Sequence, residues 1–436
     1  MLRSAGGEIP RDHPLSVTVP GCVDGWAELS AELGVLDLAA CLAPAIDHAT
    51  TGFEVSNEQA GAFEATMSLY LGHQAVEEFY PGGRPVTAGQ VVRRARLAKT
   101  LGDIASDGRD AFYRGQAAED IVEELGGIIT PDDLASPHAD WISPIAATVS
   151  GFSAWTIPPN SQGYLGPASL AVFEMVDPPH DPENPAWWHL LIESYRAVAW
   201  ERDDLVADPA HAPLPEELLL DPVRLERAAR SVDRGHTGTW PRGMGKASGT
   251  AYLCVVDDEG IAISLIQSNY YGTGSAFGAR RSGFLLQNRG GGFSLMPGHP
   301  NELLPGKRPL HTLSPTLWTA GTSTRWVLGT RGGAVQPQLV AQMAARAILA
   351  SQNLETAQAA PRWTVEEFGP FSPPRLQLEP WLDPGIADAL ASLGHQIESM
   401  SGPQSGWGPV SIIEVDGDLR ATQRDPRVDT TSAIVT

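Results

Sequence analysis

The stretch that most constrains the fold is an apolar run with a turn directly behind it. Residues Ala251 to Val256 are nearly all apolar, which predicts a strand buried on both faces. Asp258-Glu259-Gly260 then predicts a short turn, and Ile261 to Ile266 returns as a second strand. The sequence therefore predicts a strand hairpin in the protein core, with Thr250 at its start.

Thr250 follows a glycine-rich segment and is a candidate nucleophile. A threonine hydroxyl is a weak nucleophile and needs a base beside it. If the chain were cut between Gly249 and Thr250, the new α-amine would have a pKa of about 7.7–8.0, close to the optimum for a general base at neutral pH. The residues alone leave the ordinary alternative open, which is a threonine that only begins a strand.

Composition limits the class of protein. The chain has 436 residues, of which 42% are hydrophobic and 19% charged, as expected for a large globular protein. Its net charge of -22 argues against nucleic acid and anionic membrane surfaces as partners. No apolar run reaches transmembrane length, and the first residues lack the apolar core of a signal peptide. We therefore expect a cytoplasmic protein.

The pattern of apolar residues predicts helices and strands on both sides of the hairpin. A final hairpin is expected around Asp416-Gly417, joining Val410–Val415 to Leu419–Thr422. The predicted helices are Asp24–Leu33, Leu36–Thr50, Val91–Ile104, Asp110–Leu125, Trp187–Arg202, Leu339–Ser351 and Pro384–Leu393. Strands between two sets of helices fit a layered sandwich.

One predicted helix carries a pair of residues with metal-ligand spacing. His189 and Glu193 lie one turn apart on Trp187–Arg202, as two ligands of one ion would. Because no third ligand stands nearby in the sequence, we expect a surface pair instead. The three cysteines, Cys22, Cys41 and Cys254, are widely spaced and show no metal or redox pattern.

A series of motifs resembles the γ-glutamyltransferase (γ-glutamyl transpeptidase) family of N-terminal-nucleophile hydrolases. Thr250–Asp257 with Gly260 is similar to the strand that carries the family's nucleophile. The resemblance extends from about Pro14 to Asp429. The other motifs, in order, are Val19–Gly21, Gly25-Trp26, Leu42–Pro44, Gly108–Arg114, Thr130–Leu134, Gly272–Gly274, Gly283–Asn288, Phe293, Pro297-Gly298, Pro305–Pro315, Gly329–Gly333, Ala360–Arg362 and Asp425–Arg427.

The resemblance implies an α+β fold, namely the four-layer α/β/β/α sandwich of N-terminal-nucleophile hydrolases. It also implies self-cleavage between Gly249 and Thr250. Residues 1–249 would then form the large (α) subunit and residues 250–436 the small (β) subunit, together making one layered domain and an α/β heterodimer. The resemblance implies neither a cofactor nor a metal.

The resemblance also assigns the catalytic roles. Thr250 matches the nucleophile, which first cleaves its own chain and then attacks a γ-glutamyl amide to form an acyl-enzyme. Gly332 and Gly333 match a glycine pair whose backbone N–H groups stabilise the oxyanion, and one such donor is worth about 10²–10³ in rate. From the residues alone, a tight turn before the next helix remains the alternative for this pair.

Four further residues match substrate-binding positions. His311 and Thr312 match two hydroxyl residues that hold the substrate α-carboxylate, although His311 departs from that pattern. Asn269 matches, to within one residue, an asparagine near the substrate amino group, and Ser268 stands beside it.

The largest departure from the family pattern precedes Phe293. Glutathione-processing members carry an acidic residue there, which pairs with the glutamyl α-ammonium group, whereas this chain has Gly292. A buried ammonium group needs such a partner. Arg289 offers a guanidinium group that binds carboxylates, which favours a substrate without the α-amino group. A structural, salt-bridged Arg289 is the alternative.

We therefore expect a γ-glutamyltransferase-like amidohydrolase or acyltransferase that acts through an acyl-Thr250 intermediate. Its substrates would be a γ-glutamyl or related acyl amide and an acceptor, either water or an amine. A glutaryl- or cephalosporin-acylase-like enzyme, or a hydrolase of a biosynthetic intermediate, is the first alternative. The second is a non-catalytic relative that acts as a subunit or binding protein, because the chain begins just before Val19 and the N-terminal segment usual in the family is not seen.

Overall fold

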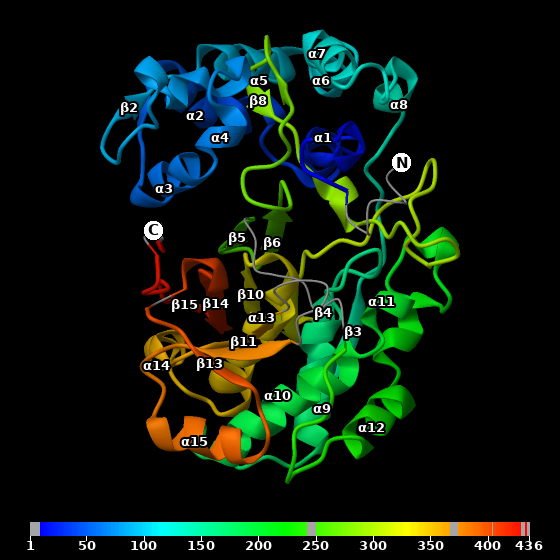
Figure 1. Cartoon of the computed structure of the whole chain (residues 1–436), viewed down its shortest axis with the longest axis vertical. Coiled ribbons are helices and arrows are strands. Elements are labelled where there is room, and N and C mark those ends of the chain that lie inside the picture. The colour runs from blue at the N-terminus through cyan, green and yellow to red at the C-terminus, as the bar shows by residue number, and fades with distance from the viewer. Residues whose placement is uncertain (1–8, 242–249, 367–373, 403, 429–431, 434–436) are drawn as a thin grey trace. The chain divides into compact units, whose positions relative to one another are not determined.

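The computed structural model describes residues 9–241, 250–366, 374–402, 404–428 and 432–433 (Figure 1). The chain forms two compact units. The first comprises Met1–Trp141 with Asn269–Gly291, and the second comprises Ile142–Ser268 with Gly292–Thr436. Within the described ranges, no helix is long and apolar enough to cross a membrane.

The first unit is mainly helical. Its helices are α1 (Cys22–Leu33), α2 (Leu38–Thr51), α3 (Asn57–Ala65), α4 (Met67–Tyr70), α5 (Ala95–Asp107), α6 (Arg109–Tyr113), α7 (Gln116–Glu124) and α8 (Pro131–Ala135). Two pairs of short strands accompany them, β1 (Phe53–Glu54) with β2 (Val91–Val92) and β7 (Gly278–Ala279) with β8 (Phe284–Leu285).

Two predicted helices of this unit differ from the structure. Val91 and Val92 form strand β2, so the predicted helix begins only at Ala95. The helix predicted over Asp110–Leu125 is divided at Gly115 into α6 and α7. A Cβ atom at Gly115 would lie 2.3 Å from the carbonyl oxygen of Ala111, so the break depends on a residue without a side chain.

A six-stranded antiparallel sheet is the centre of the second unit. Its strand order is β15-β14-β10-β9-β4-β3. The strands are β3 (Ile145–Val149), β4 (Phe152–Thr156), β9 (Thr316–Ala320), β10 (Ser323–Thr330), β14 (Val410–Asp416) and β15 (Leu419–Thr422). The last two form the hairpin predicted around Asp416-Gly417, with Asp416 opposite Leu419.

Helices pack against this sheet and against one another. α9 contacts β3 and α13 contacts β10, while α10 packs on α9. Their shared core contains Trp188, Tyr195, Trp318 and Trp363, all almost fully buried. The helices are α9 (Leu165–Met175), α10 (Pro185–Ala199), α11 (Arg202–Leu205), α12 (Pro222–Arg230), α13 (Gln336–Ala344, continued by a π-helical turn over Ala345–Leu349), α14 (Leu354–Ala359) and α15 (Pro384–Ser392). A small sheet, β11 (Trp363–Glu366), β12 (Arg375–Leu378) and β13 (Ile397–Ser399), completes the unit.

The predicted hairpin around Gly260 is present as β5 (Ala251–Val256) and β6 (Ala262–Gln267). It contacts β10 and β14 of the large sheet. Tyr252 packs on Gly329 so closely that a Cβ atom at Gly329 would lie 2.3 Å from the tyrosine ring.

The prediction that β5 is buried on both faces is wrong. Residues along β5 alternate between exposed and half-buried, and Leu253 and Val255 are 47% and 48% exposed. The physical reason is that β5 belongs to a two-stranded ribbon, which packs through one face only.

Candidate active site

The hairpin register places Thr250 beside Ser268. Ala251 is opposite Gln267 in the antiparallel pair, so the next residue of each strand faces the other. The hydroxyl oxygens of Thr250 and Ser268 are 3.0 Å apart. Local strand pairing thus gives the predicted nucleophile a hydroxyl partner.

Gln336 makes a second contact with Thr250. This residue begins α13 and is fully buried. Its Oε1 accepts a hydrogen bond of 3.0 Å from the backbone N–H of Ser314, which leaves its Nε2 to donate to Thr250 Oγ1 at 3.4 Å. Because the threonine oxygen accepts this bond, its own proton can point toward Ser268.

The predicted oxyanion glycines lie between β10 and α13. Gly332 and Gly333 have φ angles of 134° and 56°, which are strained for any residue with a side chain. Gln162 fixes this turn from behind, because its Nε2 donates to the carbonyl oxygens of Ala334 at 3.1 Å and Gly333 at 3.4 Å. The turn is therefore both unusual in conformation and firmly held, as an oxyanion site requires.

The predicted carboxylate-binding residues are connected to the same turn. The His311 N–H donates to the carbonyl of Asn160 at 2.7 Å, and its own carbonyl accepts from the N–H of Gln162 at 2.9 Å. Gln162 Nε2 also lies 3.4 Å from the carbonyl oxygen of Thr312. The structure therefore brings His311 and Thr312, the glycine turn, and Thr250 with Ser268 into one hydrogen-bonded neighbourhood of the second unit.

Asn269 and Arg289 belong to the first unit and are described within it. Asn269 is exposed, and its side-chain amide donates to the carbonyl of Thr273 at 3.2 Å. Arg289 is only 4% exposed, its guanidinium carbon lies 4.2 Å from the centre of the Tyr270 ring, and burial lowers its pKa to about 10. The roles predicted for both residues in substrate binding stay predictions.

Gly292 has no room for the acidic side chain of glutathione-processing members. A Cβ atom there would lie 2.8 Å from the carbonyl oxygen of Leu310, a backbone atom that cannot easily move. The buried Asn301 holds the two segments together, since its Nδ2 donates to the Gly292 carbonyl and its Oδ1 accepts from the Leu310 N–H at 2.9 Å. The local backbone therefore leaves no space for a side chain at position 292, which accounts for the departure from the family pattern.

Sequence reasoning missed two glutamines that connect the site, Gln162 and Gln336. Both are 0% exposed, and a buried amide is costly unless it is hydrogen-bonded. Gln336 follows the glycine pair closely and begins a helix that is otherwise largely apolar, which was an available signal. The sequence signal for Gln162 was weaker and consisted only of its position in the loop from Pro158 to Gly163.

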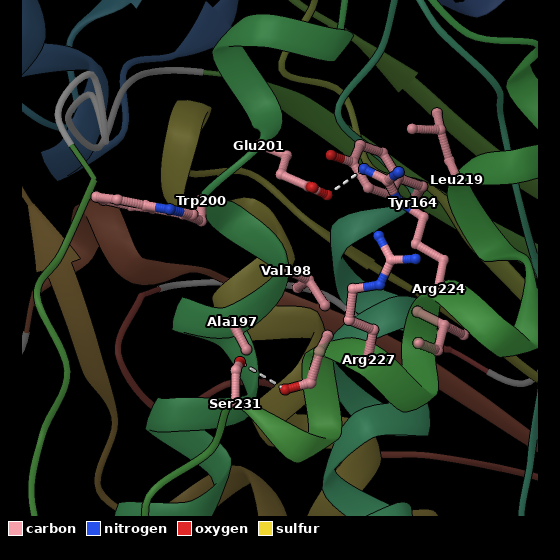
Figure 2. Close-up of a pocket in the computed structure, with 11 residues that line it drawn as sticks. Tyr164, Ala197, Val198, Trp200, Glu201, Leu219, Arg224, Arg227 and Ser231 are labelled. Carbon is pink, nitrogen blue, oxygen red and sulfur yellow. Dashed lines mark hydrogen bonds and ion pairs between the residues drawn. The ribbon is translucent and has the colours of Figure 1, made fainter.

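A cavity of about 170 Å³ lies elsewhere in the second unit (Figure 2). Its lining includes Tyr164, Trp200, Leu219 and Arg224 but none of the site residues predicted above. The guanidinium group of Arg224 is already paired with the carboxylate of Glu201. The cavity therefore does not compete with Thr250 as the candidate active site.

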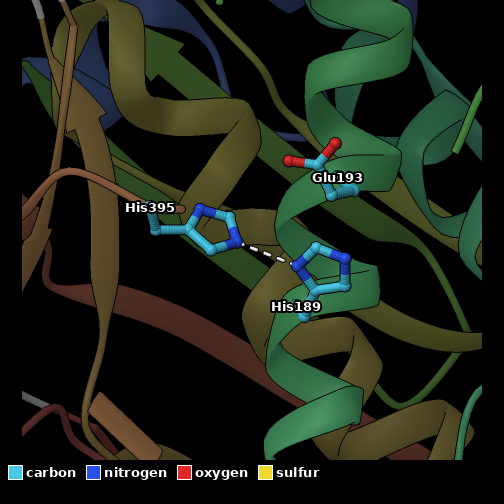
Figure 3. A group of neighbouring side chains, drawn as sticks. All are labelled: His189, Glu193 and His395. Atoms are coloured by element: carbon cyan, nitrogen blue, oxygen red, sulfur yellow. Dashed lines mark hydrogen bonds between the residues drawn. The ribbon is translucent and has the colours of Figure 1, made fainter. Parts of the chain in front are cut away.

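The expectation that His189 and Glu193 form a surface pair is wrong. The two residues are 1% and 0% exposed on α10. A third residue, His395, joins them from the segment before β13, and one ligand atom from each lies within 4.8 Å of the others (Figure 3). Burial and the neighbouring His189 and Arg196 lower the pKa of His395 to about 3, so this imidazole is neutral at pH 7.

The model of the family described as gamma-glutamyltranspeptidase matches residues 1–435. Among curated proteins, the glutathione hydrolase-like YwrD proenzyme of Bacillus subtilis is 34% identical over 422 residues, covering 95% of this chain and 80% of the relative. The oxamate amidohydrolase proenzyme of Klebsiella pneumoniae is 33% identical over 431 residues, covering 96% of this chain and 81% of the relative.

A solved structure is also similar across nearly the whole chain. It is the crystal structure of a cephalosporin acylase from Bacillus halodurans, with a TM-score of 0.88 and 31% sequence identity. The match covers 98% of this chain and 80% of that one.

Proposed function

Because the chain belongs to the gamma-glutamyltranspeptidase family, we propose that Thr250 is the nucleophile of an amidohydrolase that cleaves its own chain before Thr250. The chain is a γ-glutamyltranspeptidase-like hydrolase of the N-terminal-nucleophile class, and its fold is the α+β sandwich expected from the sequence. The observation that carries the assignment of Thr250 is its contact with both Ser268 and Gln336.

Self-cleavage would begin with attack of Thr250 Oγ1 on the carbonyl carbon of Gly249, which lies outside the described residues. The C–N bond between the two residues breaks, and the nitrogen keeps the electron pair and takes up the hydroxyl proton. The resulting ester is hydrolysed by water, which frees the α-amine of Thr250 and the carboxylate of Gly249. An α/β heterodimer is the product.

Turnover would use the liberated α-amine as the base. It removes the proton of Thr250 Oγ1 as this oxygen attacks the substrate amide carbon. The oxyanion would be stabilised by the backbone of the Gly332-Gly333 turn. The α-ammonium group then returns the proton to the leaving amine as the C–N bond breaks, and water or another amine resolves the acyl ester.

The substrate class follows from Gly292. Because a side chain at this position would collide with the Leu310 carbonyl, the chain does not supply a carboxylate there for a substrate ammonium group. We therefore favour acyl groups that end in a carboxylate and lack the α-amino group, such as those of glutaryl or oxalyl amides. Similar proteins named oxamate amidohydrolase and cephalosporin acylase support this choice.

Hydrolysis of matched para-nitroanilides tests the function. The wild-type chain should migrate as two fragments on denaturing electrophoresis and hydrolyse the glutaryl compound with a kcat/KM at least about tenfold above that of the γ-glutamyl compound. Thr250→Ala should stay intact and lose at least about 10³-fold in activity, while Thr250→Ser should retain part of both reactions.

Two results of this experiment would change the proposal. A faster γ-glutamyl reaction would remove the argument from Gly292 and leave the nucleophile in place. A wild-type chain that stays intact and hydrolyses none of the amides would instead support a non-catalytic subunit or binding protein.

Gly292→Asp tests the steric argument directly. Restoring the acidic residue should not increase γ-glutamyl turnover, because the Cβ atom clashes with the Leu310 carbonyl, and we expect thermal unfolding at a lower temperature. Gly291→Asp is the matched control, since the nearest atom to its Cβ is 3.5 Å away. A gain of γ-glutamyl activity in Gly292→Asp, with unchanged stability, would contradict the steric argument.

The proposal also includes the acceptor of the acyl group and the cellular compartment of the protein. Water is the expected acceptor, and an amine acceptor would appear as a transfer product when glycylglycine is added. The cytoplasmic location expected from the sequence stays a prediction that cell fractionation would test.

A further inference from the structure

Two histidines and a glutamate form a buried cluster in the second unit (Figure 3). His189 Nδ1 and His395 Nε2 face each other at 2.9 Å. Glu193 lies one turn along α10 from His189, and all three residues are at most 4% exposed. Buried imidazole and carboxylate groups at such short range are the donor set that Zn²⁺ binds in proteins.

The hydrogen bonds around His189 orient it as a metal ligand. Its Nε2 lies 2.8 Å from the backbone carbonyl oxygen of Asp233, which can only accept, so Nε2 carries the proton. The lone pair of a neutral His189 is then on Nδ1, which faces His395. A backbone carbonyl that fixes the outer nitrogen of a histidine in this way is the usual support of metal-binding histidines.

Hydrogen bonding within the chain does not fully satisfy the cluster. In the neutral form of His189, Nδ1 accepts, so His395 donates through its Nε2 and its own Nδ1 becomes an acceptor. That Nδ1 is buried and has no hydrogen-bond partner within the described parts of the chain. A cation bound at Nε2 would leave this nitrogen without a partner as well, now carrying the ring proton, so it does not distinguish the metal-bound state from a hydrogen-bonded pair.

We propose that His189, Glu193 and His395 form a binding site for a divalent transition-metal cation of the zinc type. Zn–N distances of about 2.0–2.1 Å in tetrahedral geometry place two ligand nitrogens about 3.3 Å apart, so the facing rings need to separate by only a few tenths of an ångström. The cation takes the place of the hydrogen bond between the rings, and the proton on His395 Nε2 moves to Nδ1 of the same ring. Because the residues are buried, the ion enters while the chain folds, and its role is structural, joining α10 to the segment before β13.

The positive charge of Arg196 disfavours cation binding at this cluster. Its Nε donates to Glu193 Oε2 at 2.6 Å, and Thr237 Oγ1 and the Gly238 N–H also donate to this carboxylate. A carboxylate can accept about four such bonds, so one position remains for the metal. The guanidinium charge still repels a cation, and the Arg196 side chain is only 12% exposed, so water screens this repulsion little. Zinc binding is therefore expected to strengthen when Arg196 is neutralised.

Metal analysis of the intact protein tests the proposal. The chain, purified without a histidine tag from zinc-supplemented medium, should retain about one zinc per chain after gel filtration. His395→Gln should lose it, and the exposed-surface control His180→Gln should retain it. In zinc-limited medium, Arg196→Gln should contain at least twice as much zinc as the wild type. Thr250→Ala should bind as the wild type does, because the site is independent of the proposed chemistry.

Cobalt gives a second measurement that needs no variant. Protein produced in cobalt-supplemented medium should show the intense visible absorption of tetrahedral Co²⁺, and a chelator should lower the unfolding temperature of the zinc protein by several degrees. Wild-type protein with no more zinc than His395→Gln and no cobalt absorption would overturn the proposal. It would leave the cluster as a neutral hydrogen-bonded pair.

Discussion

Two regions of the second unit, both carrying motifs of the family, are built in opposite ways. The nucleophile hairpin, β5–β6, is half-exposed, and Thr250 is held by contacts of 3.0 and 3.4 Å. The C-terminal charge network, formed by Arg362, Glu379, Asp425 and Arg427, has side chains at most 4% exposed. Arg362 contacts Asp425 at 2.6 Å, and Arg427 contacts Glu379 at 2.5 Å.

The two regions illustrate two different roles of a family motif. One motif stabilises the fold, and the other is expected to perform chemistry. The charge network holds backbone, since Arg362 also donates to the Trp407 carbonyl and Asp425 accepts from the Val410 N–H. Removing one partner of such a buried network leaves the others uncompensated. The hairpin contributes little to the core, so its motif is better explained by chemistry. Four experiments test whether stability depends on the charge network and catalysis on the hairpin.

The largest effect on stability is expected for Asp425→Asn. The substitution leaves Arg362 without its buried counter-charge, which should lower the free energy of unfolding by about 3–5 kcal/mol. Urea unfolding measures this loss, and the turnover of the molecules that remain folded should change little. Asp416→Asn is the control, because that carboxylate is 66% exposed in its contact with Arg325 and its loss should cost less than about 1 kcal/mol. Equal losses in the two variants would remove the distinction.

Acid should affect the same network. Burial alone would raise the pKa of Asp425, but Arg362, Arg427 and two backbone N–H groups hold this pKa below its usual value. The stabilisation from Asp425 is therefore present above the unfolded-state pKa of about 3.9 and is lost as the pH falls toward the lower folded-state pKa. Wild-type unfolding free energy should fall in this range by up to about 1.4 kcal/mol per pH unit from this group. Asp425→Asn should lack that part of the slope.

Gln336→Glu tests the hydrogen bond donated to Thr250, although it also places a carboxylate at a fully buried position and so lowers stability. The carboxylate keeps an acceptor for the Ser314 N–H but removes the donor to Thr250 Oγ1. We expect kcat/KM to fall by about 10–100-fold, equivalent to about 1.4–2.7 kcal/mol. Gln336→Met, which also leaves the Ser314 N–H without its acceptor, should lose about 1–3 kcal/mol of stability in addition. Unchanged turnover in both variants would contradict a role for Gln336.

Ser268→Ala should have the smallest effect. It removes one hydroxyl beside Thr250 and leaves the hairpin register unchanged, so turnover should fall by no more than about tenfold, with unfolding within about 0.5 kcal/mol of wild type. Self-cleavage followed over time by mass spectrometry would show whether the same hydroxyl orients Thr250 before processing. A loss as large as that of Thr250→Ala would make Ser268 a catalytic residue.

Local sequence signals predicted the parts of the structure that depend on neighbouring residues. Gly260 and Asp416-Gly417 both mark hairpins that are present, and the first of these set the pairing of Thr250 with Ser268. The family pattern identified Gly332 and Gly333, whose positive φ angles agree with a turn that needs glycine.

Features that depend on distant segments were not predictable in this way. The apolar residues of β5 did not reveal that only one face would be covered, because the covering strands, β10 and β14, are far along the chain. His395 could not be joined to His189 from spacing alone, since 206 residues separate them. The clash at Gly292 likewise depends on the backbone of Leu310, not on any residue type.

One side chain, Gln162, ties the candidate carboxylate-binding loop to the glycine turn. The same Nε2 lies within 3.4 Å of carbonyl oxygens on Thr312, Gly333 and Ala334, and Arg202 fixes the other end of the amide at 3.1 Å. Any substrate that displaces the Thr312 backbone must therefore redistribute bonds at the turn as well. Recognition of the acyl group and readiness of the oxyanion donors would then be thermodynamically coupled through a single amide.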